Sequence, residues 1–182
     1  ALWTGPQVCS RTIPFEDAET VSRTLRRKVV YWDNYPVNDG SMACELHIGP
    51  YTGRDVRLPT VSRGFLINPM NQAMASIPVL TSIAAYLKDP ATYDPLSAWE
   101  SALEAFAPHC AQSLKLFAEM NLISPLNPKG EEMVSDRWID AYSSSARSGS
   151  IAQAASLLQQ HALTLNEAVQ TLKTTMPLAW LR

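Results

Sequence analysis

One short segment of the sequence gathers side chains that can bind a small polar molecule. The apolar run Val29–Tyr31 has the character of a buried strand, and the cluster Trp32–Asp39 follows it directly. The cluster combines a tryptophan and a tyrosine with two asparagines and two aspartates. Aromatic rings offer flat apolar faces, whereas amides and carboxylates form hydrogen bonds. A sugar has matching C–H faces and hydroxyl edges, so the cluster indicates a carbohydrate-binding site.

The elements around this cluster alternate between strands and helices in the first half of the chain. Strands are predicted over Leu2–Trp3, Val29–Trp32 and Gly64–Ile67, because these short apolar runs end at turn-forming residues. Helices are predicted over Phe15–Arg27 and around Ile77–Leu87, where apolar residues recur at helical spacing. This alternation implies a parallel sheet, and the predicted fold class is therefore α/β.

Polar residues follow the C-terminal end of each predicted strand. They are Thr4 after the first strand, Asp33 and Asn34 after the second, and Asn68 after the third. In α/β barrels and open parallel sheets this is the edge that binds ligands. We therefore expect these side chains to share one binding edge.

The second half of the chain is predicted to be entirely helical. A turn-rich connector, Lys88–Pro95, leads into it, and Asp94 is placed to cap the next helix. Further helices are predicted over His109–Leu122, Lys129–Ser145, Ser150–His161 and a last segment in which Thr164 and Glu167 have capping-box spacing. The tryptophans of this half are expected in its core: Trp99, Trp138 and Trp180. The predicted division is thus 1–88 and 89–182.

Composition excludes several classes of partner. The 182 residues carry a formal net charge of -2 and no basic block, so nucleic acid is not expected as a partner. No apolar run reaches the roughly 18 residues of a membrane span. Cys9, Cys44 and Cys110 are widely spaced and the histidines are scattered, so we expect no disulfide framework, metal site or cofactor.

Three parallel strands pose a physical problem, because they are too few to close a barrel. A complete (β/α)₈ barrel needs roughly 250 residues. The sequence is therefore interpreted either as an unusual small sheet or as the C-terminal part of something larger.

Four sequence blocks, in this order, resemble one enzyme family: Trp3–Pro6, Tyr31–Asp39, Leu46–Arg54 and Gly64–Asn71. Together they resemble the β-N-acetylglucosaminidases of glycoside hydrolase family 84, the O-GlcNAcases and their bacterial relatives. The resemblance covers roughly the first 90 residues, and the motifs of the helical half are less specific. It implies a (β/α)₈ TIM barrel followed by a helical domain, with the three predicted strands as strands six, seven and eight.

The resemblance also implies an activity. The family hydrolyses β-linked N-acetylglucosamine with retention, by substrate-assisted catalysis through an oxazoline intermediate. Two adjacent aspartates polarise the acetamido group and act as the general acid and base. This sequence contains no adjacent pair of aspartates. We therefore expect no catalytic residue in this chain, and we expect the N-terminal part of the same barrel to supply the pair.

Four residues are expected, by resemblance, to bind the sugar. Trp32 would wall the pocket around the acetamido methyl group, and Asn34 would hydrogen-bond near the reaction centre. Asp39 would accept hydrogen bonds from the 4- and 6-hydroxyls, with Asn68 at the same end. The expected partner is a glycan or glycoprotein that bears N-acetylglucosamine. Since Asn68 precedes Pro69, it also suits a plain turn.

Structural roles compete with binding at several positions. On residue type alone, Trp32 suits core packing at the end of a strand. Asp33 suits a salt bridge or a loop cap, Arg54 suits pairing with a loop carboxylate, and Tyr35 and Asn38 suit loop scaffolding. At the level of the whole protein, the alternative to a glycosidase is a non-catalytic carbohydrate-binding or helical interaction protein.

Overall fold

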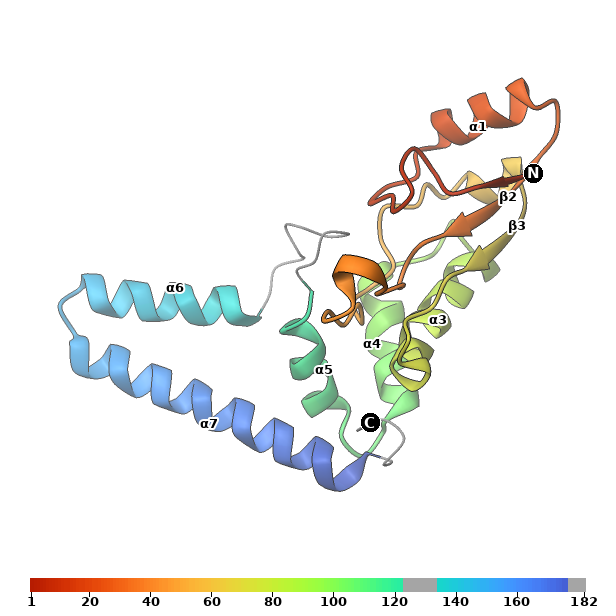
Figure 1. The fold of residues 1–182 in the computed structure, drawn as a ribbon. Coiled ribbons are helices and arrows are strands. Elements are labelled where there is room, and N and C mark those ends of the chain that lie inside the picture. The colour runs from red at the N-terminus through yellow and green to blue at the C-terminus, as the bar shows by residue number, and fades with distance from the viewer. Residues whose placement is uncertain (123–133, 177–182) are drawn as a thin grey trace.

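The computed structural model describes residues 1–122 and 134–176 and contains a small parallel sheet flanked by helices (Figure 1). The strands are β1 (Leu2–Trp3), β2 (Val29–Asp33) and β3 (Ser62–Ile67), in the order β1-β2-β3. Both strand pairs are parallel. The α/β class and the three predicted strands are confirmed.

The predicted helices occur in order with shifted ends, and two short helices, over Gly40–Met42 and Leu58–Val61, were not predicted. The helices are α1 (Phe15–Thr24), η1 (Gly40–Met42), α2 (Leu58–Val61), α3 (Ala73–Lys88), α4 (Pro95–Phe106), α5 (Ala111–Glu119), α6 (Val134–Arg147) and α7 (Ile151–Thr175). The start of the predicted helix Lys129–Ser145 lies outside the described residues. Helix α1 ends earlier than predicted, because Arg26 turns the chain with a positive φ of 50°. Asp94 caps α4 as predicted, with the Ser97 N–H donating to its Oδ1 at 2.7 Å. No helix in the described part of the chain has the length and apolar character to cross a membrane.

The two faces of the sheet have different surroundings. Along β2, Val29, Tyr31 and Asp33 are buried, whereas Trp32 between them is 38% exposed. Residues Trp3, Tyr31 and Phe65 are paired in register, and their rings form a row across the packed face, with centroids 5.6 and 4.9 Å apart. The other face leaves large apolar side chains exposed: Leu2, Trp32 and Leu66. Parallel sheets are normally covered on both faces, so this open face is unusual.

One apolar core joins the sheet-bearing half to the helical half. It contains Ile48 and Tyr51 from the loops, Val79 from α3, Trp99 from α4 and Leu114 from α5. The indole N–H of Trp99 donates to the carbonyl of Ile48 at 2.7 Å across this core. The secondary structure changes at residue 88, but the residues before and after it share one apolar core. A division into two domains at that point stays a prediction.

Helix α3 buries a different face from the one its sequence suggests. The spacing of Ile77 and Leu87 marks an apolar stripe, but both side chains are 38% exposed. The buried side of α3 includes Val79, Ile83 and Tyr86. This helix is apolar nearly all round, so periodicity alone does not select the buried side.

The C-terminal helices form an antiparallel pair, α6 and α7, that extends away from the sheet (Figure 1). The prediction of a helix end near His161 and a capping box at Thr164 is wrong, because α7 is continuous and Thr164 Oγ1 donates to the Gln160 carbonyl within it. Trp138 is half-buried and stacks on His161 at 4.1 Å. Trp99 is buried as predicted, and Trp180 lies outside the described residues.

Candidate functional site

Three of the four predicted sugar-binding residues form one hydrogen-bonded group at the C-terminal ends of β2 and β3. The Oδ1 atom of Asn34 accepts from the indole N–H of Trp32 at 2.8 Å and from Nδ2 of Asn68 at 3.0 Å. The backbone N–H of Asn68 donates to the carbonyl of Asp33 at 3.0 Å, which ties the two strand ends together. The parallel register thus joins residues that lie 34 positions apart in the sequence.

The side-chain orientation of Asn34 is defined by its neighbours. The residue is 8% exposed, and its Nδ2 donates to the carbonyl of Val8 in the segment after β1. Two donors meet its oxygen and one acceptor meets its nitrogen, so the amide cannot turn without breaking all three bonds. A primary amide has two N–H groups, and within the described residues one of them is bonded to Val8.

Trp32 presents an aromatic face on the open side of the sheet. Its indole N–H is held by Asn34, and the side chain is 38% exposed. Within the described residues Trp32 is therefore not packed in the core, and its role in the complete protein stays a prediction. A held, accessible indole ring is a suitable platform for the apolar part of a ligand.

Asp39 lies on an exposed loop that its buried neighbour anchors. Asn38 is fully buried, and its Nδ2 donates to the Glu45 carbonyl at 2.8 Å and to Gln72 Oε1 at 2.7 Å. Its Oδ1 accepts from the backbone N–H of Asn71 at 2.9 Å. Asn38 is thus loop scaffolding, as predicted, and it fixes where the next residue, Asp39, leaves the core.

The loop that carries Asp39 packs against the segment after β1, because Cys9 contacts the buried pair Val37 and Met42. Burial raises the pKa of the Cys9 thiol, and the carboxylates of Asp39 and Asp33 raise it further. Cys9 follows Val8, whose carbonyl accepts from Asn34. The segment after β1 therefore contacts Asn34 through Val8 and the loop that carries Asp39 through Cys9. Sequence reasoning missed this segment, because a backbone carbonyl carries no signal in residue type.

Asp33 forms a buried ion pair instead of facing a ligand. Arg54 donates to the Asp33 carboxylate through two nitrogens, with Nε 2.9 Å from Oδ2. The Tyr51 hydroxyl also donates to Oδ2, at 2.6 Å. Burial acts to lower the pKa of Arg54, but the charge of Asp33 outweighs it and raises that pKa. Burial and Asp33 also raise the pKa of Tyr51 well above its usual value. The structural alternatives for Asp33 and Arg54 are confirmed.

The hydrogen-bonded group of Trp32, Asn34 and Asn68 offers binding contacts, and Asp39 adds a carboxylate on an exposed loop. Trp32, Asn34 and Asn68 do not titrate, and the carboxylate of Asp33 is fully engaged. Among the residues that the structure describes, no group of three or more His, Cys, Asp or Glu side chains could hold a metal ion. The arrangement can hold and orient a polar ligand.

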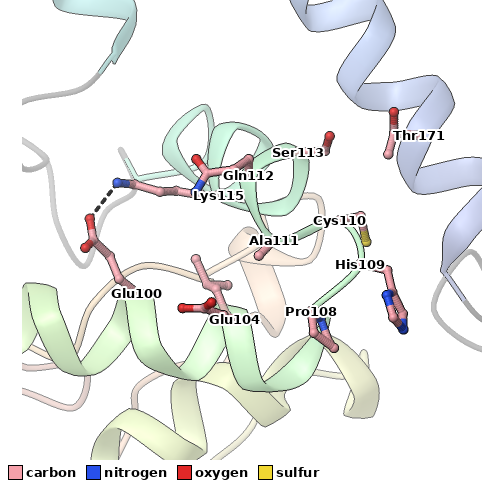
Figure 2. Close-up of a pocket in the computed structure, with 11 residues that line it drawn as sticks. Glu100, Glu104, Pro108, His109, Cys110, Ala111, Gln112, Ser113, Lys115 and Thr171 are labelled. Carbon is pink, nitrogen blue, oxygen red and sulfur yellow. Dashed lines mark hydrogen bonds and ion pairs between the residues drawn. The ribbon is translucent and has the colours of Figure 1, made fainter.

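A separate hollow of about 390 Å³ lies in the helical half, between α4, α5 and α7 (Figure 2). Lys115 donates to Glu100 at its edge, and the charged side chain of Glu104 also lines it. None of the four predicted sugar-binding residues lines this hollow.

Comparison with known proteins identifies the family. The family model described as beta-N-acetylglucosaminidase matches residues 1–119. The chain belongs to the β-N-acetylglucosaminidase family. The match covers all the sheet-bearing half with its four predicted site residues, and it extends into the helical half as far as the end of α5.

The chain is similar to proteins named as O-GlcNAc hydrolases and to a further solved structure. The Protein O-GlcNAcases of Rattus norvegicus and Mus musculus are each 39% identical over 87 residues, which is 48% of this chain and 9% of theirs. A mutant O-GlcNAc hydrolase of Thermobaculum terrenum matches 99% of this chain and 39% of its own, with 33% identity and a TM-score of 0.90. CpGH84B matches with 28% identity and a TM-score of 0.80 over 99% of this chain and 32% of its own. The predicted resemblance to glycoside hydrolase family 84 is confirmed. This chain spans less than half of the length of each of these relatives.

Proposed function

We propose that this chain is the sugar-binding, C-terminal part of a retaining β-N-acetylglucosaminidase that removes O-linked N-acetylglucosamine from proteins. The observation that carries the proposal is the hydrogen-bonded group of Trp32, Asn34 and Asn68 at the carboxyl ends of two parallel strands. These three residues bring together an aromatic face and oriented amides at the ligand-binding edge of an α/β sheet. Membership of the family and the similarity to named O-GlcNAc hydrolases support the same reaction.

The proposal includes a complete barrel. Residues 1–88 contribute β1, β2 and β3 as strands six, seven and eight of a (β/α)₈ TIM barrel, and residues 89–182 form a helical domain. The open face with Leu2, Trp32 and Leu66 supports this assignment, because the interior of a barrel would cover it. The N-terminal part of the same barrel is the partner that completes the sheet.

Catalysis in this proposal is assisted by the substrate. The acetamido oxygen of the sugar attacks the anomeric carbon and forms an oxazoline, while an adjacent pair of aspartates outside this chain polarises the acetamido group and transfers the proton. Trp32 walls the acetamido methyl group and holds the nucleophilic oxygen close to the anomeric carbon. The second amide N–H of Asn34 donates near the reaction centre. Asp39 accepts from the 4- and 6-hydroxyls, and Asn68 assists there.

The test is turnover of an aryl N-acetylglucosaminide by the full-length protein and its Asp39→Ala variant. Loss of a charge-assisted contact is expected to cost about 2 kcal/mol, so KM rises and kcat/KM falls about 30-fold. Asp140→Ala, an exposed aspartate on α6, is the matched control and is expected to leave the kinetics unchanged. Unchanged kinetics for Asp39→Ala would remove Asp39 from the site. Sugar binding without turnover by the full-length protein would favour the non-catalytic alternative.

A further inference from the structure

His47 is a buried histidine whose two ring nitrogens both face hydrogen-bond acceptors. Its side chain is 1% exposed. Nδ1 lies 2.8 Å from the carbonyl of Val37, and Nε2 lies 2.9 Å from the carboxylate of Glu45. Both ring nitrogens are therefore within hydrogen-bond distance of an oxygen atom from another part of the same loop. The imidazole thus bridges residues 37 and 45 of the long segment that follows β2.

Other contacts fix the position of this ring. The Tyr35 ring stacks on it with centroids 6.4 Å apart, and the His47 backbone N–H donates to the sulfur of Met70 at 3.2 Å. Glu45 is the charged group that faces the ring directly, and its side chain is 32% exposed. The His47 ring is therefore buried, whereas its partner Glu45 is partly exposed to solvent.

The bridge closes the loop that carries Asp39. Asn38 Nδ2 donates to the Glu45 carbonyl at 2.8 Å, so the chain at 37–38 is tied twice to the chain at 45–47. Residues 39–44, here called the Asp39 loop, lie between these ties. Inside the loop, the Met42 N–H donates to the carbonyl of Asp39 at 2.9 Å. Asp39 is the first residue of this loop, so its carboxylate lies directly after the residues that the two ties hold in place.

We infer that His47 is a positioning residue that holds the Asp39 loop, and with it the Asp39 carboxylate, in the sugar-binding arrangement. The inference rests on the proposed function of Asp39. Without the bridge, the loop samples further conformations, because the ordering of each backbone residue is opposed by conformational entropy. Apparent affinity falls in proportion to the fraction of molecules in the competent conformation. Loss of His47 therefore weakens substrate binding without touching the reacting atoms.

The first test is steady-state kinetics of the full-length protein with His47→Leu. A competent fraction of about one tenth raises KM roughly tenfold, with kcat within about twofold of the parent value. His109→Leu, at an exposed histidine between α4 and α5, is the matched control and is expected to change neither constant. A fall in kcat with unchanged KM would overturn the positioning role.

A double-mutant cycle separates this inference from the proposed function. If His47 acts through Asp39, then His47→Leu costs about tenfold in kcat/KM in the parent and less than about twofold in the Asp39→Ala background. Equal losses in both backgrounds would overturn the positioning role even though Asp39 still binds the sugar. If Asp39→Ala itself has no effect, the proposed function fails, and the positioning role fails with it.

Hydrogen exchange and the partner residue give independent readouts. His47→Leu is expected to speed amide exchange at Met42 and Glu45, whose N–H groups bond inside the loop, without a change in α3. Glu45→Gln keeps an acceptor for Nε2 and is expected to retain the parent KM, whereas Glu45→Leu is expected to raise it. The two Glu45 variants also serve if His47→Leu does not fold, because Glu45 is partly exposed. Unchanged exchange in the loop, or equal KM values for the two Glu45 variants, would overturn the inference.

Discussion

Removal of Asp33 is expected to destabilise the protein strongly, because it leaves a buried guanidinium without its counter-charge. The side chains of Arg54 and Asp33 are 5% and 2% exposed. Breaking a buried ion pair by removing one partner costs about 3–5 kcal/mol. The Tyr51 hydroxyl would also lose its acceptor, whereas Arg54 would keep its bonds to the carbonyls of Arg11 and Thr52. Because Arg54 keeps these bonds, Asp33→Ala is expected to lower the free energy of unfolding by about 3 kcal/mol, the lower end of that range.

The assay is urea unfolding of the full-length protein, followed by circular dichroism. The exposed pair of Arg57 with Asp55 provides the matched control, since Arg57 is 50% exposed and still contacts Asp55 at 2.6 Å. Arg57→Leu is expected to leave the midpoint nearly unchanged, because solvent screens such pairs. Replacing both buried partners, Asp33→Leu with Arg54→Met, is expected to recover most of the loss, because no buried charge is left unpaired.

Two results would refute this reasoning. A cost below about 1 kcal/mol for Asp33→Ala would mean that the charge of Arg54 finds solvent or another partner. A shift for Arg57→Leu as large as that for Asp33→Ala would mean that burial does not set the strength of these pairs.

Two further positions give sharp expectations. The Tyr31 hydroxyl is buried with no hydrogen-bond partner among the described residues, so Tyr31→Phe is expected to raise the free energy of unfolding by up to about 1 kcal/mol; a lower urea midpoint would contradict this. Burial also raises the pKa of Tyr31 from 10.0 to about 12. The hydroxyl therefore loses its proton at a lower pH in the unfolded state than in the folded state, and the free energy of unfolding falls as the pH rises from 10 to 12. Tyr31→Phe is expected to make this fall smaller, as measured by urea unfolding across this pH range. Gly5 has a φ of +98°, and a Cβ there would lie 2.4 Å from Ser10 Oγ, so Gly5→Ala is expected to lower the thermal midpoint, with Gly64→Ala, which meets nothing within 4 Å, as the control.

Local sequence patterns were sufficient for the elements that lead to the site. The β-branched run before Trp32 and the apolar run before Asn68 predicted β2 and β3, because strand period and turn residues are properties of a few neighbouring positions. The Asp94–Pro95 pair likewise predicted the start of α4, since a cap acts within one turn. The family resemblance was also present in contiguous blocks.

Sequence patterns gave wrong predictions where the same local sequence is compatible with more than one arrangement. The apolar surface of α3 surrounds the helix, so only packing against α4 and the loops selected Val79 and Ile83 over Ile77. The capping-box spacing at Thr164 is equally compatible with a helix interior, and the continuous α7 uses that hydroxyl for a bond back to Gln160.

The sequence by itself determined which residue types stand at the ligand-binding edge and which family they belong to. Only the tertiary structure decided the role of each residue. Asp33 forms an ion pair with Arg54, 21 positions away. Asn34 is oriented by hydrogen bonds to Trp32, Asn68 and the carbonyl of Val8. The physical reason is that a carboxylate or an amide acquires its role from the partners within hydrogen-bond distance. Those partners come from separate strands and loops, so their identity depends on how the strands pair and the loops close.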